Sequence, residues 1–113
     1  MARINYIELP STALSASKTF YAEAFEMTLV DYGPTYSCTV SGDVEVGLQG
    51  DLGAATDAPL PVILVDDLEA TLAAVANAGG VIVRPIFAFP GGRRFHFRDP
   101  SGNELAAWVQ TKG

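Results

Sequence analysis

The chain has few of the residues that mark secreted, membrane-spanning or disulfide-linked proteins. It contains one cysteine, Cys38, so no disulfide can form within it. Because disulfides persist mainly in oxidising compartments, this scarcity favours the cytoplasm. No apolar run approaches the roughly 18 residues that span a bilayer, and the first residues lack the basic and apolar segments of a secretory signal. We therefore expect a cytoplasmic protein with no membrane partner.

Basic residues are also scarce, with 7 Lys and Arg against 13 Asp and Glu and a net charge of −6. Nucleic-acid binding requires a basic surface that releases counterions from phosphates. The one local cluster, Arg93, Arg94 and Arg98, is most simply a solvated strand edge, although an anion-binding or interface role stays open. We expect no nucleic-acid partner.

Two similar turns stand sixty residues apart in the sequence. Ser41-Gly42-Asp43 and Ser101-Gly102-Asn103 each lie between alternating apolar runs. A polar, glycine-containing turn between two such runs is typical of a β-hairpin. Its repetition predicts two copies of one module.

The order of elements repeats in the same way. The first module is predicted as a strand at 3–9, a helix to about 25, and strands at 28–32, 35–40 and 43–49. Ser11 and Thr12 are its candidate helix caps. The apolar face of this helix is predicted from four residues: Leu14, Phe20, Tyr21 and Phe25.

The second module is predicted as a strand at 60–65, a helix ending at Gly79-Gly80, and strands at 81–84, 93–98 and 103–109. Asp66 is the expected helix cap, with Glu69 in the capping-box position. At 113 residues, the chain is one domain. We divide it into module 1 at about 1–50, a linker at 51–59, and module 2 at about 60–113.

Four segments give the chain a family resemblance: Tyr6–Pro10, Lys18–Tyr21 with Phe25, Val65–Leu72, and Phe97–Asn103. In order and spacing they resemble the vicinal oxygen chelate superfamily, which includes glyoxalase I, extradiol dioxygenases, fosfomycin resistance enzymes and bleomycin resistance proteins. The resemblance implies an α+β fold of two tandem βαβββ modules, forming a cupped mixed sheet with helices outside. It also implies a ligand or metal inside the cup, and a homodimer.

Enzymes of this superfamily place metal ligands on the first and last strands of each module. The resemblance puts these four positions at Tyr6, at Val46 or Gly47, within Leu60–Val62, and at Ala106. Divalent metals prefer imidazole and carboxylate ligands, and His96 is the only histidine. We therefore expect no metal and no other cofactor.

Strand alternation predicts which side chains line the cup. With Tyr6 and Ala106 pointing inward, the predicted ligand-binding residues are Tyr6, Glu8, Tyr36, Gly47, Gln49, His96, Ala106 and Trp108. Aromatic side chains with a few polar groups suit an organic ligand, and Glu8 favours a cationic or aromatic one. Each residue also has a structural interpretation. Trp108 can serve the core or a dimer contact, and His96 can be an ordinary strand histidine.

Three functions remain open from the sequence. The first is a metal-free protein that binds a small organic molecule, in the manner of the bleomycin resistance relatives. The second is a glyoxalase-like lyase or isomerase in which Glu8 and His96 act as an acid–base pair. The third is a dimeric, partner-binding protein with a vestigial cup.

Overall fold

A computed structural model describes residues 2–111 and divides them into two compact units. The N-terminal unit comprises residues 5–60, and the C-terminal unit comprises residues 2–4 with 61–111. No helix in the described residues has the length and apolar character needed to cross a membrane.

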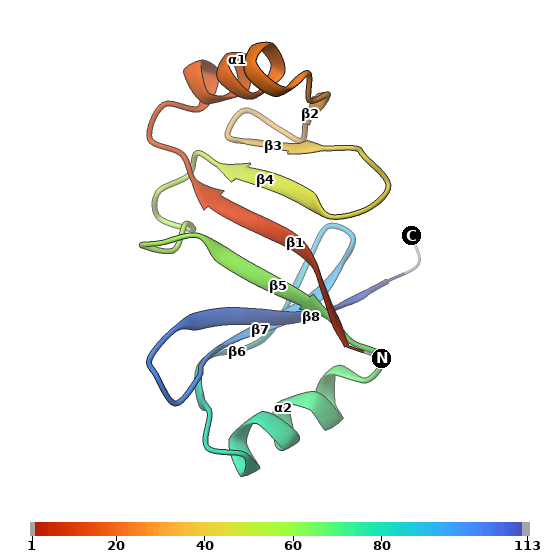
Figure 1. Ribbon diagram of the computed structural model, residues 1–113. Helices are drawn as coiled ribbons and strands as arrows, with labels where there is room; N and C mark the ends of the chain where they lie inside the picture. The colour runs from red at the N-terminus through yellow and green to blue at the C-terminus, as the bar shows by residue number, and fades with distance from the viewer. Residues whose placement is uncertain (1, 112–113) are drawn as a thin grey trace. The chain divides into compact units, whose positions relative to one another are not determined.

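The N-terminal unit holds the first βαβββ module (Figure 1). Its elements are β1 (Arg3–Pro10), α1 (Leu14–Phe25), β2 (Leu29–Asp31), β3 (Tyr36–Thr39) and β4 (Glu45–Gln49), with the first residues of β1 counted in the other unit. The strand order is β2-β3-β4-β1. β1 runs parallel to β4, and the other pairs are antiparallel.

The C-terminal unit repeats this arrangement. Its elements are β5 (Leu60–Leu64), α2 (Leu68–Asn77), β6 (Val81–Phe89), β7 (Gly92–Arg98) and β8 (Glu104–Gln110). The strand order is β5-β8-β7-β6, again with the first strand parallel to the last. The α+β fold class and the duplicated module are therefore confirmed.

The core of the C-terminal unit shows the predicted alternation of strand faces. Phe95 of β7 and Ala107 of β8 are buried with Leu68 at the start of α2. Val109 packs against the same cluster. Odd-numbered residues of β7 and β8 therefore face the helix, and even-numbered residues face away from it. This division places His96 on the face opposite α2.

Both predicted helix starts were wrong. α1 begins after Ala13, which makes no side-chain cap, and the Ser11 hydroxyl instead donates to the Leu9 carbonyl at 3.2 Å. In α2 the cap is Asp67, whose carboxylate accepts from the Ala70 N–H at 3.0 Å. Glu69 lies one residue too early for a capping box from Asp67, and it pairs with Arg93 instead. Asp66 and Asp67 both have side chains suited to cap α2, so the sequence alone did not distinguish them. For α1 the sequence could not show that the N-cap residue would be an alanine.

The strand predicted at 81–84 was too short, because β6 continues to Phe89. Proline normally interrupts a strand, since it has no N–H to donate. β6 lies at the end of the strand order, and its pairing with β7 shifts between Arg84 and Phe87. Pro85 falls in that irregular segment, where a missing donor is tolerated.

The predicted apolar face of α1 is present but not buried. Phe20 and Phe25 are 56% and 61% exposed, and no residue of α1 is buried. The rings of Phe20, Tyr21 and Phe25 lie against one another, with centroids 5.1–6.3 Å apart. The helix thus presents an aromatic cluster at its surface.

Replacing Asp67 tests the observed helix start. Asp67→Ala removes the acceptor for the Ala70 N–H, so we expect the free energy of unfolding to fall by about 1 kcal/mol. Asp57→Ala, which removes a carboxylate from a loop, is the matched control. Urea unfolding measures both; equal losses in the two variants would contradict the Asp67 cap.

Candidate ligand-binding site

Three strands of the N-terminal unit bring a set of predicted site residues together. Glu8 of β1 is paired with Gly47 of β4, and Gly47 is paired with Cys38 of β3. Side chains at paired positions share one face of a sheet. Tyr6 and Tyr36 lie two residues from Glu8 and Cys38 and therefore project from that same face.

Glu8 is the most deeply buried acid at this site, with 3% of its surface exposed. The Tyr36 hydroxyl donates to Glu8 Oε1 at 3.2 Å. The Tyr6 and Tyr36 hydroxyls are also hydrogen-bonded to each other. Since Tyr36 gives its single hydrogen to Glu8, Tyr6 is the donor in that second bond. The result is a directed chain from Tyr6 through Tyr36 to the carboxylate.

Gly47 makes this convergence of the two phenols sterically possible. A Cβ atom at position 47 would collide with the hydroxyls of both Tyr6 and Tyr36. The space next to Gly47 is therefore occupied by the phenols themselves. Position 47 requires glycine because the two hydroxyls lie where a Cβ atom would be, and not because the backbone angle is unusual.

The ionisation of these groups favours hydrogen-bond donation over nucleophilic chemistry. Burial, followed by the neighbouring Tyr36, raises the pKa of Tyr6. Burial, followed by the Glu8 charge, raises the pKa of Tyr36. Burial also raises the pKa of the Cys38 thiol. All three stay protonated near neutral pH, and a protonated thiol is a poor nucleophile.

Gln49 lies on β4 with Gly47, but its side chain is engaged elsewhere. Its Oε1 accepts from the Asp51 N–H at 3.0 Å, which ties the side chain to the turn after the strand. Of the five predicted residues in this unit, the hydroxyl and carboxylate network therefore involves Tyr6, Glu8 and Tyr36, with Gly47 beneath it.

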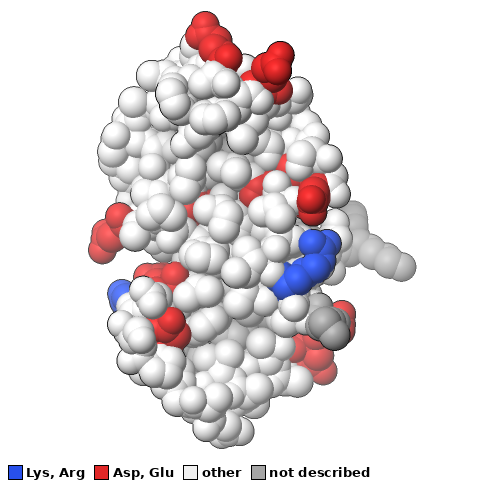
Figure 2. Space-filling view, in the orientation of Figure 1, with Lys and Arg blue, Asp and Glu red and all other residues white. Residues whose placement is uncertain are grey.

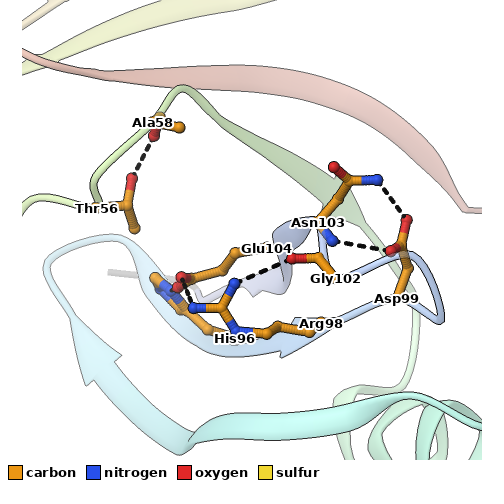
Figure 3. Close-up of polar contacts among 8 residues, drawn as sticks. All are labelled: Thr56, Ala58, His96, Arg98, Asp99, Gly102, Asn103 and Glu104. Carbon is orange, nitrogen blue, oxygen red and sulfur yellow. Dashed lines mark hydrogen bonds and ion pairs between the residues drawn. The ribbon is translucent and has the colours of Figure 1, made fainter.

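The other three predicted residues lie in the C-terminal unit. His96 is 2% exposed and pairs with Ala106 across β7 and β8. Its Nδ1 lies 2.8 Å from Glu104 Oε2, as Figure 3 shows. Trp108 shares this face, and its ring centroid is 6.2 Å from that of Phe89. The three residues thus occupy the face opposite α2, as strand alternation predicts.

Glu104 fixes the hydrogen-bonding state of His96. Burial lowers the pKa of His96, although the hydrogen bond to Glu104 acts in the opposite direction. The ring is therefore neutral near pH 7, and its hydrogen must lie on Nδ1 because a carboxylate can only accept. Nε2 is then an acceptor. It is buried and has no hydrogen-bond partner within residues 2–111.

Three residues of this face, Glu104, Arg84 and Phe87, were not among the predicted site residues. Glu104 bonds His96 diagonally across two strands, and this contact depends on a register that the sequence does not reveal. Arg84 lies within the strand predicted at 81–84, but its pairing with His96 likewise depends on register. Phe87 lies beyond the predicted end of that strand. Asp99 behaves as its turn position suggests, because it accepts from the backbone N–H groups of Ser101 and Asn103. Figure 3 shows the bond from Asn103.

The positions that hold a metal in the superfamily are not occupied by metal-binding side chains. Tyr6 is bonded to another phenol, Gly47 has no side chain, and Ala106 and the residues of β5 are apolar. Within the described chain, no three His, Cys, Asp or Glu side chains are grouped where they could hold a metal ion. The residues present do not fit the superfamily's metal centre.

Comparison with known families identifies the class of protein. The model of the Glyoxalase/Bleomycin resistance protein/Dioxygenase superfamily matches residues 3–107, so the chain belongs to this superfamily. It is 29% identical to CFP32 of Mycobacterium bovis, a protein whose name assigns it provisionally to the glyoxylases. The match covers 96% of this chain but 46% of CFP32, so the chain spans less than half of that relative.

Solved structures show the same fold at lower identity. BH1468 of Bacillus halodurans has a TM-score of 0.82 at 12% identity, with 99% of this chain and 96% of that chain covered. The Mn(II)-bound glyoxalase of Novosphingobium aromaticivorans has a TM-score of 0.70 at 21% identity, covering 96% of this chain and 40% of that one. These similarities establish the architecture and leave the chemistry to the residues.

The close contact between Gly47 and the phenol hydroxyls predicts that substitutions at positions 47 and 36 have non-additive effects on stability. Gly47→Ala places a methyl group against the phenol hydroxyls, so we expect a loss of about 2 kcal/mol in unfolding free energy. In a Tyr36→Phe background one clashing oxygen is gone, and the loss should fall to about half. Gly53→Ala is the control, because its Cβ meets only Asp51 Oδ1 at an ordinary 3.4 Å. Additive effects of the two substitutions would contradict the packing described.

The lowered pKa of His96 gives a prediction for pH dependence. The unfolded chain, with a histidine pKa near 6.5, binds a proton more readily than the folded one. The contribution of His96 to stability is therefore complete above that value and is lost as the pH falls below it. In a His96→Gln variant, the free energy of unfolding should therefore decline less between pH 7.5 and about 5.5 than in the unaltered protein. Urea unfolding over this range measures it, and identical slopes in both proteins would refute the buried neutral imidazole.

Proposed function

We propose that this protein binds a small organic molecule without a metal, in the manner of the bleomycin resistance branch of its superfamily. The observation that carries the proposal is the buried Glu8 carboxylate, joined to the Tyr6 and Tyr36 phenols on one sheet face. Aromatic side chains around a small number of polar groups are the usual composition of an organic-ligand site.

The charge of the N-terminal unit supports a cationic or aromatic ligand. Residues 5–60 contain eight acidic residues and one basic residue, Lys18. On the face shown in Figure 2, the surface over α1 carries acidic and no basic side chains. Such a field attracts cations, and phenol rings next to a carboxylate stabilise them through cation–π and charge interactions.

A lyase or isomerase reaction is the second candidate. It is favoured by the carboxylate that orients His96, because a base held by a third group is a recurring catalytic arrangement. The sequence-based pairing of Glu8 with His96 stays a prediction, since the two residues belong to different units. In this candidate Glu104, rather than Glu8, is the group that orients the imidazole.

We also propose that the protein acts in the cytoplasm as a homodimer, without nucleic-acid or membrane partners. The single cysteine and the acidic charge support the location and the lack of nucleic-acid binding. The exposed rings of Phe20 and Phe25 support a second subunit, because exposed apolar clusters commonly mark interfaces.

A thermal-shift screen with cationic aromatic compounds tests the binding function. A ligand of the folded state, at about ten times its dissociation constant, should raise the Tm by about 5 °C. Glu8→Gln keeps an oxygen acceptor for Tyr36 but removes the charge, so the shift should disappear. Glu23→Gln, on the exposed surface of α1, makes the same charge change and should retain it. An unchanged shift in Glu8→Gln, or no shift with any compound, would refute the proposal.

A further inference from the structure

The face of the C-terminal unit that is turned away from α2 has a row of paired residues that includes Arg84, a cation that the proposed function does not use. Arg84 of β6, His96 of β7 and Ala106 of β8 are successive partners across three strands. Paired positions share a face, so a guanidinium, an imidazole and a methyl group lie side by side. The Arg84 guanidinium, which is always charged, therefore lies next to the buried imidazole of His96.

Arg84 is available for an anion. Its guanidinium carbon lies 3.7 Å from the centroid of the Phe87 ring, within the range of a cation–π contact. Arg84 is exposed, and within residues 2–111 it has no carboxylate partner. Arg94 lies near the same ring, with its guanidinium carbon 5.3 Å from the centroid. The exposed guanidinium of Arg84 makes this part of the face attractive to carboxylates.

His96 adds a hydrogen-bond acceptor, Nε2, to this face. Its Nδ1 hydrogen is held by Glu104 at 2.8 Å, so Nε2 can only accept. That atom is buried and unpartnered. A buried polar atom without a hydrogen bond costs free energy, which a ligand hydroxyl could recover. Nε2 has no contact with solvent in this structure, so a ligand must displace a side chain, and exposed Arg84 opposite His96 is placed to move.

We propose that this face is a subsite for an organic acid that also carries a hydroxyl group. Arg84 binds the carboxylate, His96 Nε2 accepts the hydroxyl hydrogen, and the Phe87 ring supports the carbon skeleton. Glu104 is a positioning residue, because it acts through the imidazole. This subsite goes beyond the proposed function, because its ligand is an anion and its residues differ from Glu8 and the phenols.

The single histidine makes a direct test possible, because its imidazole signals need no assignment. Long-range ¹H–¹⁵N spectra of the full chain at pH 7.5 should show the Nδ1–H tautomer. Mandelate, an aromatic hydroxy acid, should move the Nε2 resonance, whereas phenylacetate, which lacks the hydroxyl, should not. The dissociation constant for mandelate should be about fivefold lower than that for phenylacetate, as expected for one added hydrogen bond.

Three variants separate the contributions. Arg84→Gln should weaken both acids by about tenfold, since a charge-assisted contact is lost. Glu104→Gln replaces an obligate acceptor with an amide that can either donate or accept, so Nδ1 no longer has to carry the hydrogen and Nε2 is no longer held as an acceptor. The preference for mandelate should therefore fall, while phenylacetate binding stays. Arg93→Gln is the matched control, because this guanidinium pairs with Glu69 of α2 on the opposite face. It should leave both dissociation constants unchanged.

The outcomes distinguish this subsite from the proposed function. An Nε2–H tautomer in the unaltered protein, equal affinity for the two acids, or no binding of mandelate up to about a hundred millimolar (weaker than any useful site) would each overturn the inference. The Glu8→Gln variant decides the other question. Cationic compounds that bind through Glu8 while mandelate fails would support the proposed function and reject the subsite. Mandelate binding that depends on Arg84, together with no binding of any cationic compound, would support the subsite and reject the proposed function.

Discussion

The buried carboxylate of Glu8 sets the conditions that the rest of its site meets. A carboxylate with 3% exposure must be hydrogen-bonded, and the Tyr36 hydroxyl donates to it. Because the single hydrogen of Tyr36 goes to Glu8, Tyr6 is the donor to Tyr36, and both phenols fit only because position 47 is glycine. One buried charge thus accounts for three surrounding residues, and it defines the polar character of the N-terminal unit.

The two units repeat one fold but differ in charge. Residues 5–60 carry eight acids and one base, whereas all five arginines lie outside that range. The N-terminal unit therefore presents a carboxylate with phenols, and the C-terminal unit presents guanidinium groups with an oriented imidazole. Duplication fixes the strands and their faces, while substitution on those faces sets the chemistry. The two proposed sites on this scaffold would therefore bind groups of opposite charge.

Much of this arrangement could be predicted from the sequence, because strand alternation is a strong constraint. The repeated module and the faces of β7 and β8 follow from it. The length of β6 did not, since a proline is tolerated only where a strand is at an edge. The His96–Glu104 contact is diagonal, so it depends on strand register, and the exposure of Phe20 depends on tertiary packing. Periodicity contains neither kind of information.

The chain differs from the metal-dependent members of its superfamily most clearly at the metal positions, which hold a phenol, a glycine and apolar side chains. Such residues offer a divalent ion neither imidazole nor carboxylate. The most direct test is elemental analysis of the purified protein after dialysis against Zn, Mn, Fe and Ni salts and then metal-free buffer. The account predicts far less than one ion per chain. One tightly held ion per chain, lost in a Tyr6→Phe variant, would contradict it.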